Sequence, residues 1–282
     1  MGTMYEVSPH PAWVNTMQRF LQPYWDALLN GDFAESAAAT RLTVEELRGW
    51  LLQMYPFIHT FPKFLAEALI KVEDDDSRAF LIDNIRAEKA HAEHWLWMAQ
   101  GFGLRSRELM EHAAGDRPML RDVQSLTDWL WYINTKGTLA EAVAATSYAI
   151  EGVTGDLTRK TLAGFEAYGR FPEVVMDART VRWMREHARY DDEHPKVALE
   201  VIKRYATTER HQHKVMLAAK RSLQLLDLAF NTAYRARSQS DAPAQRAGVE
   251  LRTAERRRHA ERIAFPERRF GERRGRPLRS VA

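Results

Sequence analysis

Apolar residues recur along most of this chain with the three-to-four-residue spacing of amphipathic α-helices. The first such segment covers residues 12–29. A second begins at Thr43, which forms a capping-box pair with Glu46, and Pro56 and Pro62 are expected to kink or restart it before residues 64–72. Further apolar stripes predict helices over residues 78–100, 126–135, 139–157 and 196–234, the last as one or two helices.

This pattern predicts an all-α fold, because no turn-bounded run of alternating apolar and polar residues indicates a strand. We expect about seven or eight helices packed as one bundle over residues 1–237. Residues 238–245 form a polar linker, and residues 249–282 are rich in arginine and poor in apolar side chains. Residues 238–282 are therefore expected to be a basic, disordered tail, since they cannot bury a core of their own.

Composition limits the chemistry without choosing a function. A chain of 282 residues with 45% hydrophobic content can bury a sizeable core. It contains no cysteine, which excludes disulfides, cysteine-bound zinc or iron–sulfur centres, and a cysteine nucleophile. Neither a signal-peptide pattern at the N-terminus nor a run of 18 apolar residues is present, so a cytoplasmic protein without a membrane partner is expected.

Charge is distributed unevenly along the chain. The formal net charge is +3, but residues 238–282 contain 12 Arg, no Lys and 6 acidic residues, which leaves residues 1–237 at −3. Phosphate recognition needs a clustered positive surface, so nucleic-acid binding by the helical body is not expected. Only the tail has the charge to meet nucleic acid or an acidic partner, and its interspersed glutamates dilute that charge.

The most informative polar pattern lies near residue 190. At about 100° per residue on one helix, His187, Asp191 and His194 fall within roughly 60° of arc. Two imidazoles and a carboxylate suit iron, manganese or zinc, whereas calcium and magnesium prefer oxygen ligands. The alternative is a solvated polar helix surface, because residues 186–194 are charged all round.

Two other predicted helices carry matching residues. Glu88 and His91 form an E-x-x-H pair, which mirrors the D-x-x-H pair of Asp191 and His194, and Glu151 is an isolated carboxylate on the helix after residue 139. Di-iron carboxylate bundles project such pairs and extra glutamates from separate helices. His94 competes with His91, but only His91 has the E-x-x-H spacing.

At these residues the sequence resembles the haem-oxygenase-like di-iron oxidases, within the group that includes thiaminase II (TenA), pyrroloquinoline-quinone synthase and the chlamydial CADD protein. The resemblance covers roughly residues 10–230 and leaves out the tail. Three stretches carry it: Asp-Asn-Ile-Arg-Ala-Glu-Lys-Ala-His at residues 83–91 with its continuation to residue 104, residues 137–151, and His187-x-x-x-Asp191-x-x-His194.

The resemblance implies that two Fe(II) ions bind to six side chains, with O2 as co-substrate. Those ligands would be Glu88, His91, Glu151, His187, Asp191 and His194. The implied reaction is oxidation of a small organic substrate, by N-oxygenation or by oxidative C–C cleavage of a metabolite derived from an amino acid or fatty acid, with an external electron donor as a further partner.

One departure from the family pattern concerns the second iron. Some members supply another glutamate from an earlier helix, but here Gln53 and Met54 occupy that region and no glutamate lies between Glu46 and Glu67. The second iron is therefore weakly held, absent, or bound by another carboxylate such as Glu67 or Glu141.

Two other functions stay open. A cofactor-free oxidase like pyrroloquinoline-quinone synthase would use histidines as acids and bases, and a non-enzymatic ligand sensor would contact a partner through its basic tail. A thiaminase II activity is excluded by the missing cysteine nucleophile.

The sequence leaves open whether the protein forms a homodimer. Aromatic residues that could line a substrate cavity, or simply form core, are Phe57, Phe61, Trp95, Trp97, Trp129, Trp131 and Tyr148.

Overall fold

The structure is a computed structural model that describes residues 8–189 and 193–236. Within those ranges the chain forms helices and no strand, which confirms the all-α class. Two compact units can be distinguished, Met1–Gln239 and Ser240–Ala282, and every described residue belongs to the first. The expected basic tail, residues 238–282, lies outside the described residues.

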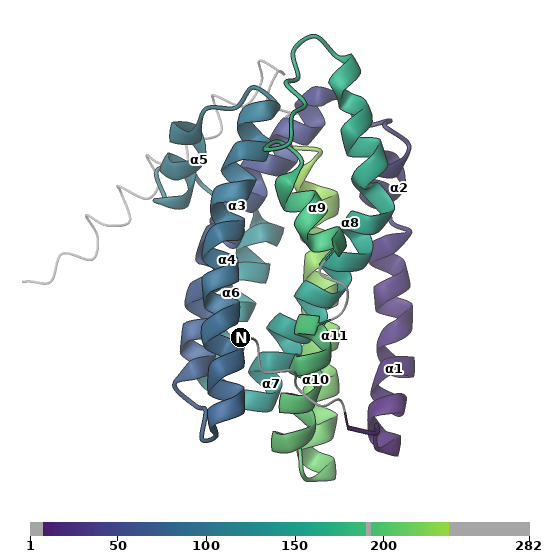
Figure 1. Cartoon of the computed structure of the whole chain (residues 1–282), viewed down its shortest axis with the longest axis vertical. Helices are drawn as coiled ribbons and strands as arrows, with labels where there is room; N and C mark the ends of the chain where they lie inside the picture. Colours follow the sequence, from purple (N-terminus) through teal and green to yellow (C-terminus); the bar gives the residue numbers. More distant parts are fainter. Residues whose placement is uncertain (1–7, 190–192, 237–282) are drawn as a thin grey trace, which may run out of the picture. The chain divides into compact units, whose positions relative to one another are not determined.

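Long helices run side by side along this first unit (Figure 1). The described residues form more helices than the seven or eight expected, because short helices and two changes of helix type occur between the long ones. In chain order the elements are α1 (Ala12–Leu29), α2 (Asp32–Ala38), α3 (Val44–Leu69), α4 (Asp75–Gly101), α5 (Ser106–Ala113), α6 (Arg121–Lys136), α7 (Leu139–Val143), the π-helix η1 (Ala144–Ile150), α8 (Glu151–Glu166), the 3₁₀ helix η2 (Ala167–Arg170), α9 (Arg182–Arg189), α10 (Glu193–Tyr205) and α11 (Glu209–Ala233).

Side-chain caps define where several helices begin. The predicted capping box of Thr43 and Glu46 opens α3. Asp74 caps α4, its Oδ1 accepting a hydrogen bond of 2.9 Å from the Ser77 backbone N–H. Each cap satisfies a backbone N–H that has no partner inside the helix. The local sequence therefore defines where α3 and α4 begin.

Of the two outcomes expected at Pro56 and Pro62, a restart of the second helix is wrong, and a kink stays a prediction. Both prolines lie inside α3, which continues from Val44–Leu69. Each removes one backbone hydrogen bond. Phe57, Phe61 and Phe64 on the same helix are buried in the core, and this packing holds the helix together across the missing bonds.

The single helix expected to carry His187, Asp191 and His194 stays a prediction, because residues 190–192 lie outside the described residues. His187 is described in α9 (Arg182–Arg189) and His194 in α10 (Glu193–Tyr205). Pro195 lies in the first turn of α10, where its missing N–H costs nothing. A proline there is compatible with a helix start.

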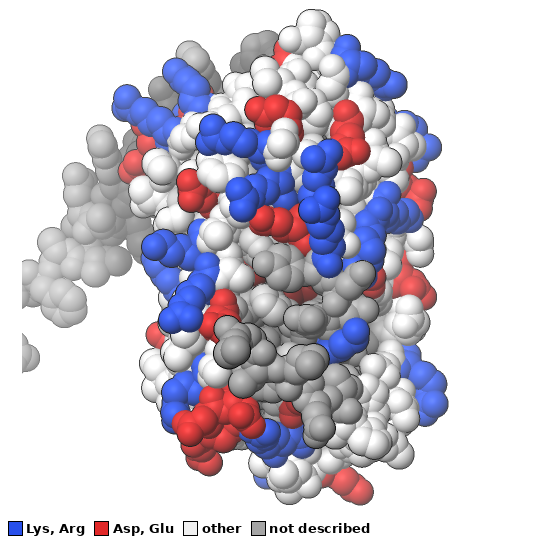
Figure 2. All heavy atoms as spheres, viewed as in Figure 1, with Lys and Arg blue, Asp and Glu red and all other residues white. Residues whose placement is uncertain are grey.

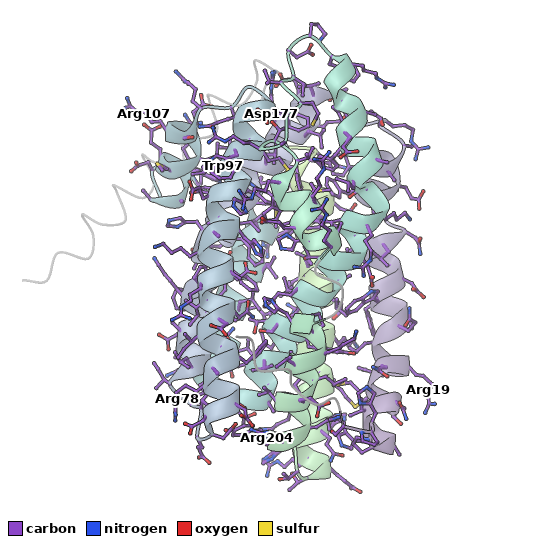
Figure 3. All side chains as sticks on the ribbon, viewed as in Figure 1. Arg19, Arg78, Trp97, Arg107, Asp177 and Arg204 are labelled. Carbon is purple, nitrogen blue, oxygen red and sulfur yellow. The ribbon has the colours of Figure 1, made fainter. Side chains whose placement is uncertain are left out.

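The outside of this unit is charged and mixed in sign. On the face shown in Figure 2, basic and acidic side chains lie beside one another. Arg78 and Arg204 lie toward one end of the bundle, and Trp97 and Asp177 toward the other (Figure 3). Among the described helices, none has both the length and the apolar character needed to cross a bilayer.

Candidate metal centre

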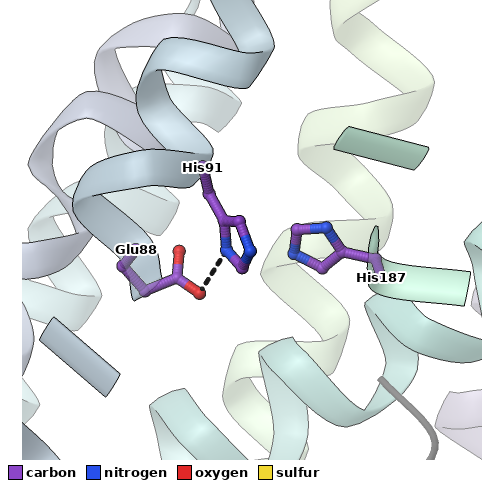
Figure 4. Close-up of side chains that lie close together, drawn as sticks. All are labelled: Glu88, His91 and His187. Carbon is purple, nitrogen blue, oxygen red and sulfur yellow. Dashed lines mark hydrogen bonds and ion pairs between the residues drawn. The ribbon is translucent and has the colours of Figure 1, made fainter. Parts of the chain in front are cut away.

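Three side chains from two helices meet in the interior of the bundle. Glu88 and His91 lie one turn apart on α4, and His187 comes from α9 (Figure 4). One ligand atom from each lies within 4.8 Å of the other two, and all three side chains are buried. This distance is short enough for one metal ion to be bound by all three.

Hydrogen bonds orient these rings. His91 Nδ1 lies 2.9 Å from Glu88 Oε1. His187 Nδ1 lies 2.9 Å from the Trp183 carbonyl oxygen, which can only accept, so this nitrogen carries the proton and donates. The lone pair of His187 is therefore on Nε2. Since the ring centroids of His91 and His187 are 4.2 Å apart, the two imidazoles face each other across the cluster.

Burial sets the charge state of the cluster. Desolvation lowers the pKa of His91 to about 4 and the pKa of His187 to about 3, so both imidazoles are neutral near pH 7. Desolvation raises the pKa of Glu88, although the nearby histidines act in the opposite direction. Among the described residues no lysine or arginine pairs with the Glu88 carboxylate, and a divalent cation would supply a positive charge beside it.

Glu151 and His194 form a second pair next to this cluster. Glu151 is the first residue of α8, and its Oε2 lies 3.3 Å from His194 Nδ1 on α10. Its Oε1 accepts a hydrogen bond of 2.8 Å from the Asn84 amide of α4. The π-helix η1 directly precedes Glu151, and such segments are often found at functional sites because they change which way the next residues face.

The remaining candidate ligands are placed as follows. Asp191 lies outside the described residues. His94 Nδ1 is 2.6 Å from Glu186 Oε2, so this histidine is turned toward α9's acidic residue and not toward Glu88. Glu141 closes the capping box of α7, and its charge and that of Glu67 act on Lys71. Neither glutamate is part of the cluster of described ligands.

The cluster lies where two pockets meet. A polar pocket is lined by His91, His194 and Arg159, and an apolar pocket by aromatic and aliphatic residues of the core. Glu88, Glu151 and His187 line both pockets. A molecule in either pocket would therefore contact the same ligands.

Three of the seven aromatic residues expected around a cavity line the apolar pocket. They are Phe57, Phe61 and Trp95. The other four have partners elsewhere: Trp97 stacks under Arg179, Trp129 donates to Ser222, Trp131 packs against Phe64, and Tyr148 packs against Trp25.

Trp183 and Asn84 lie beside the candidate ligands, although no sequence motif gave either a role. The Trp183 ring lies 4.1 Å from the His187 ring, and Trp183 also lines the apolar pocket. Trp183 lies four residues before His187, and Asn84 lies four residues before Glu88. In the sequence, this one-turn spacing was the feature that could have indicated that each residue supports a ligand.

Glycines on α8 allow the other elements to approach the cluster. A Cβ added at Gly152 would lie 2.7 Å from the Trp25 ring, which donates its indole N–H to Asp156. A Cβ at Gly155 would lie 3.5 Å from the His187 carbonyl oxygen. Gly152 thus lets α1 pack closely against the start of α8, whereas at Gly155 a Cβ would make an ordinary contact with α9.

The donor set fits iron. Two neutral imidazoles and a carboxylate, with Glu151 and His194 adjacent, match the mixed nitrogen and oxygen ligation of non-haem iron, and the absence of cysteine excludes a thiolate site. The hydrogen bond from His187 Nδ1 to a backbone carbonyl is the usual outer support of a metal-binding histidine.

Comparisons with known proteins agree with this geometry. The chain is 27% identical over 134 residues to the 4-aminobenzoate synthase of Chlamydia trachomatis. The matched region covers 46% of this chain and 55% of that protein, so the chain spans little more than half of that relative's length. It is 25% identical over 170 residues to the 4-aminobenzoate synthase of Chlamydia muridarum, covering 58% of this chain and 68% of that protein.

Solved structures share the fold. A TenA homologue from Pseudomonas syringae pv. tomato superposes with a TM-score of 0.73 at 25% identity, covering 83% of this chain and 98% of that one. A domain of unknown function with a haem-oxygenase-like fold from Shewanella denitrificans gives a TM-score of 0.68 at 16% identity, covering 82% and 96%. Residues 48–227, which include Glu88, His91 and His187, match the family described as iron-containing redox enzyme. Since that match spans more than half of the sequence, the chain belongs to the haem-oxygenase-like family of iron-containing redox enzymes.

Proposed function

We propose that this protein is a non-haem di-iron oxidase or oxygenase that uses O2 to oxidise a small organic molecule. The observation that carries the proposal is the buried convergence of Glu88, His91 and His187 at the boundary of two pockets. Glu151 and His194 lie beside this cluster, and Asp191 enters on the sequence pattern alone. When bound, iron supplies electrons and open coordination positions for O2 that no side chain provides.

The protein's own residues would hold the metal and exclude water. Glu88 offers a negative charge that burial makes costly without a cation, and His91 and His187 offer lone pairs that protons do not occupy near pH 7. Trp183 packs its ring on His187 and accepts that residue's Nδ1–H through its carbonyl, so it fixes the orientation of the imidazole.

The apolar pocket is the better candidate for the substrate. Its walls include Phe57, Phe61 and Phe230, with Leu226 and Ile150, and its polar lining residues are Glu88, Glu151, His187 and Thr154. A pocket of this composition favours a molecule with an apolar body and a reactive end. The reactive end would then lie next to Glu88 and His187, which line the same pocket.

Iron content tests the proposal. After anaerobic reconstitution with ferrous iron and removal of loose metal, the wild-type protein should retain about two irons per chain. Glu88→Gln keeps the shape of the side chain but removes its charge, and should lose iron. Glu93→Gln is the matched control, because Glu93 lies on the same helix with an exposed side chain. Equal iron in all three proteins, or none in the wild type, would refute the proposal.

A search for the reaction can start from the relatives. Because two of them are named 4-aminobenzoate synthases, formation of 4-aminobenzoate by the iron-loaded protein in air is the first specific reaction to assay. The fatty-acid- and amino-acid-derived metabolites expected from the sequence come next, with and without an external reductant. A chelator separates this proposal from the cofactor-free alternative, since activity that persists in chelator would favour acid–base chemistry by the histidines.

A further inference from the structure

Asn84 is a fully buried amide beside the candidate metal centre. It lies on α4 one turn before Glu88, with 0% of its surface exposed. Its Nδ2 donates to Glu151 Oε1 at 2.8 Å and to Ser147 Oγ at 3.2 Å. Within the described part of the chain, its Oδ1 has no hydrogen-bond partner.

The chemistry of the partners fixes the orientation of this amide. An ionised carboxylate can only accept hydrogen bonds, so the nitrogen of Asn84, and not its oxygen, must face Glu151. Both amide protons are then used, one by Glu151 and one by Ser147. The oxygen is left in a buried position without a partner, which is unfavourable. A leucine would fill this space without that cost and is a better helix former.

The two acceptors show what the amide achieves. Ser147 lies in the π-helix η1, and Glu151 follows one turn later at the start of α8. Asn84 therefore joins α4, which carries Glu88 and His91, to the segment that carries the separate carboxylate. Because Oε1 of Glu151 is held by Asn84, Oε2 is left on the side of His194, 3.3 Å from its Nδ1.

We propose that Asn84 is a positioning residue for the metal site, which fixes one oxygen of Glu151 so that the other is presented to metal together with His194. Asn84 would not itself be a ligand. This inference rests on the proposed metal-binding function, and it adds a residue outside the six-ligand set. It predicts that removing the amide weakens metal binding through Glu151 even though every ligand is still present.

Cobalt(II) binding by the metal-free protein, followed by visible absorption under anaerobic conditions, tests the inference without any enzymatic activity. The relevant signal is a cobalt absorbance whose binding affinity is lower in the Glu151→Gln variant than in the wild-type protein. In Asn84→Leu the cobalt affinity at this signal should fall by roughly 10- to 100-fold, the usual effect of losing an outer-shell hydrogen bond. Asn84→Ser, whose shorter hydroxyl cannot reach as far, should show the same direction, and it replaces Asn84→Leu should that variant fail to fold.

Asn134 provides a matched control. It is also 0% exposed, its Oδ1 also lacks a partner among the described residues, and its Nδ2 donates only to the backbone carbonyl of Leu130 within α6. Asn134→Leu therefore changes the same chemistry away from Glu151 and should keep wild-type cobalt affinity. Circular dichroism shows whether each variant retains its helices.

A double-mutant cycle separates positioning from general damage. Because Asn84 acts through Glu151, Asn84→Leu should cause no further loss when Glu151→Gln is already present. Additive losses, or an unchanged affinity in a folded Asn84→Leu protein, would overturn the inference and leave the proposed function intact. No cobalt or iron binding by the wild-type protein would instead remove the proposed function, and this inference with it.

Discussion

Acidification should destabilise the metal-free protein through its two buried histidines. Burial holds the pKa of His187 at about 3 and that of His91 at about 4, against 6.5 for an unperturbed histidine. Because the folded pKa lies below the unfolded one, the stability from each neutral imidazole is fully present above pH 6.5 and is lost as the pH falls toward 3 to 4. Between about pH 7.5 and 5.5 the unfolded chain takes up protons that the folded chain does not. This uptake lowers the free energy of unfolding by about 1.4 kcal/mol per histidine and by about 2.7 kcal/mol for both.

Urea unfolding in the presence of a chelator, followed by circular dichroism at both pH values, measures this loss. Glu88 opposes the histidines, because its raised pKa favours the folded state as the pH falls, so the useful quantity is a difference between proteins. The free energy of unfolding of His187→Asn should fall over this interval by about 1.4 kcal/mol less than that of the wild type. His213→Asn, at an exposed position on α11, should behave as the wild type does. Equal losses in His187→Asn and wild type would refute the reasoning.

Three further predictions concern packing, capping and metal linkage. Gly164→Ala places a Cβ 2.1 Å from the Ala37 carbonyl oxygen and should lower the free energy of unfolding by about 1–3 kcal/mol. Gly155→Ala places its Cβ 3.5 Å from the nearest atom and should raise the free energy of unfolding by up to about 1 kcal/mol. Thermal melts that rank the two variants in the reverse order would contradict this. Asp74→Ala removes the cap of α4 and the hydrogen bond from the Tyr205 hydroxyl, and it should lower the free energy of unfolding in urea by about 1–3 kcal/mol at pH 7. Against partial desolvation, these hydrogen bonds lower the pKa of Asp74 to about 2, so the loss should shrink as the pH falls toward that value. A loss that does not depend on pH would contradict the assignment. Cobalt(II) at about 100 times its dissociation constant should stabilise the wild-type protein by about 2.7 kcal/mol, and an unchanged unfolding midpoint would mean that the folded state does not bind it.

Local sequence was enough to predict much of the fold. The helix class and the starts of α3 and α4 follow from apolar spacing and capping residues, because these depend on neighbours a few positions away. The prolines of α3 could not be judged in this way. Whether Pro56 breaks a helix depends on how much apolar surface the flanking turns bury, and that is decided by packing against other helices.

The site was predictable to the extent that its spacing is local. Glu88 and His91 meet as one turn of α4 requires, while His187 joins them only through the packing of α9 against α4 and α8. The relation of His187 to His194 on one helix stays a prediction, since residues 190–192 between α9 and α10 lie outside the described residues. Asn84 lies in the stretch of residues 83–91 that carries the resemblance but had no assigned role, and Trp183 carried no motif. Their importance depends on which side chains they contact in the folded protein.

The two sides of the cluster differ in how firmly the fold holds them. Glu88 and His91 lie in the middle of the long helix α4, but His187 is carried by α9, whose eight residues are too few for a stable isolated helix. Contacts with neighbours must therefore hold α9 in place: Arg185 pairs with Glu166 of α8 at 2.7 Å, and Glu186 contacts His94 of α4 at 2.6 Å. A metal bound jointly by Glu88, His91 and His187 would add a further link between α4 and α9. Because linkage is reciprocal, metal binding would stabilise the docked position of α9, and any change that weakens this docking would lower metal affinity without altering a ligand.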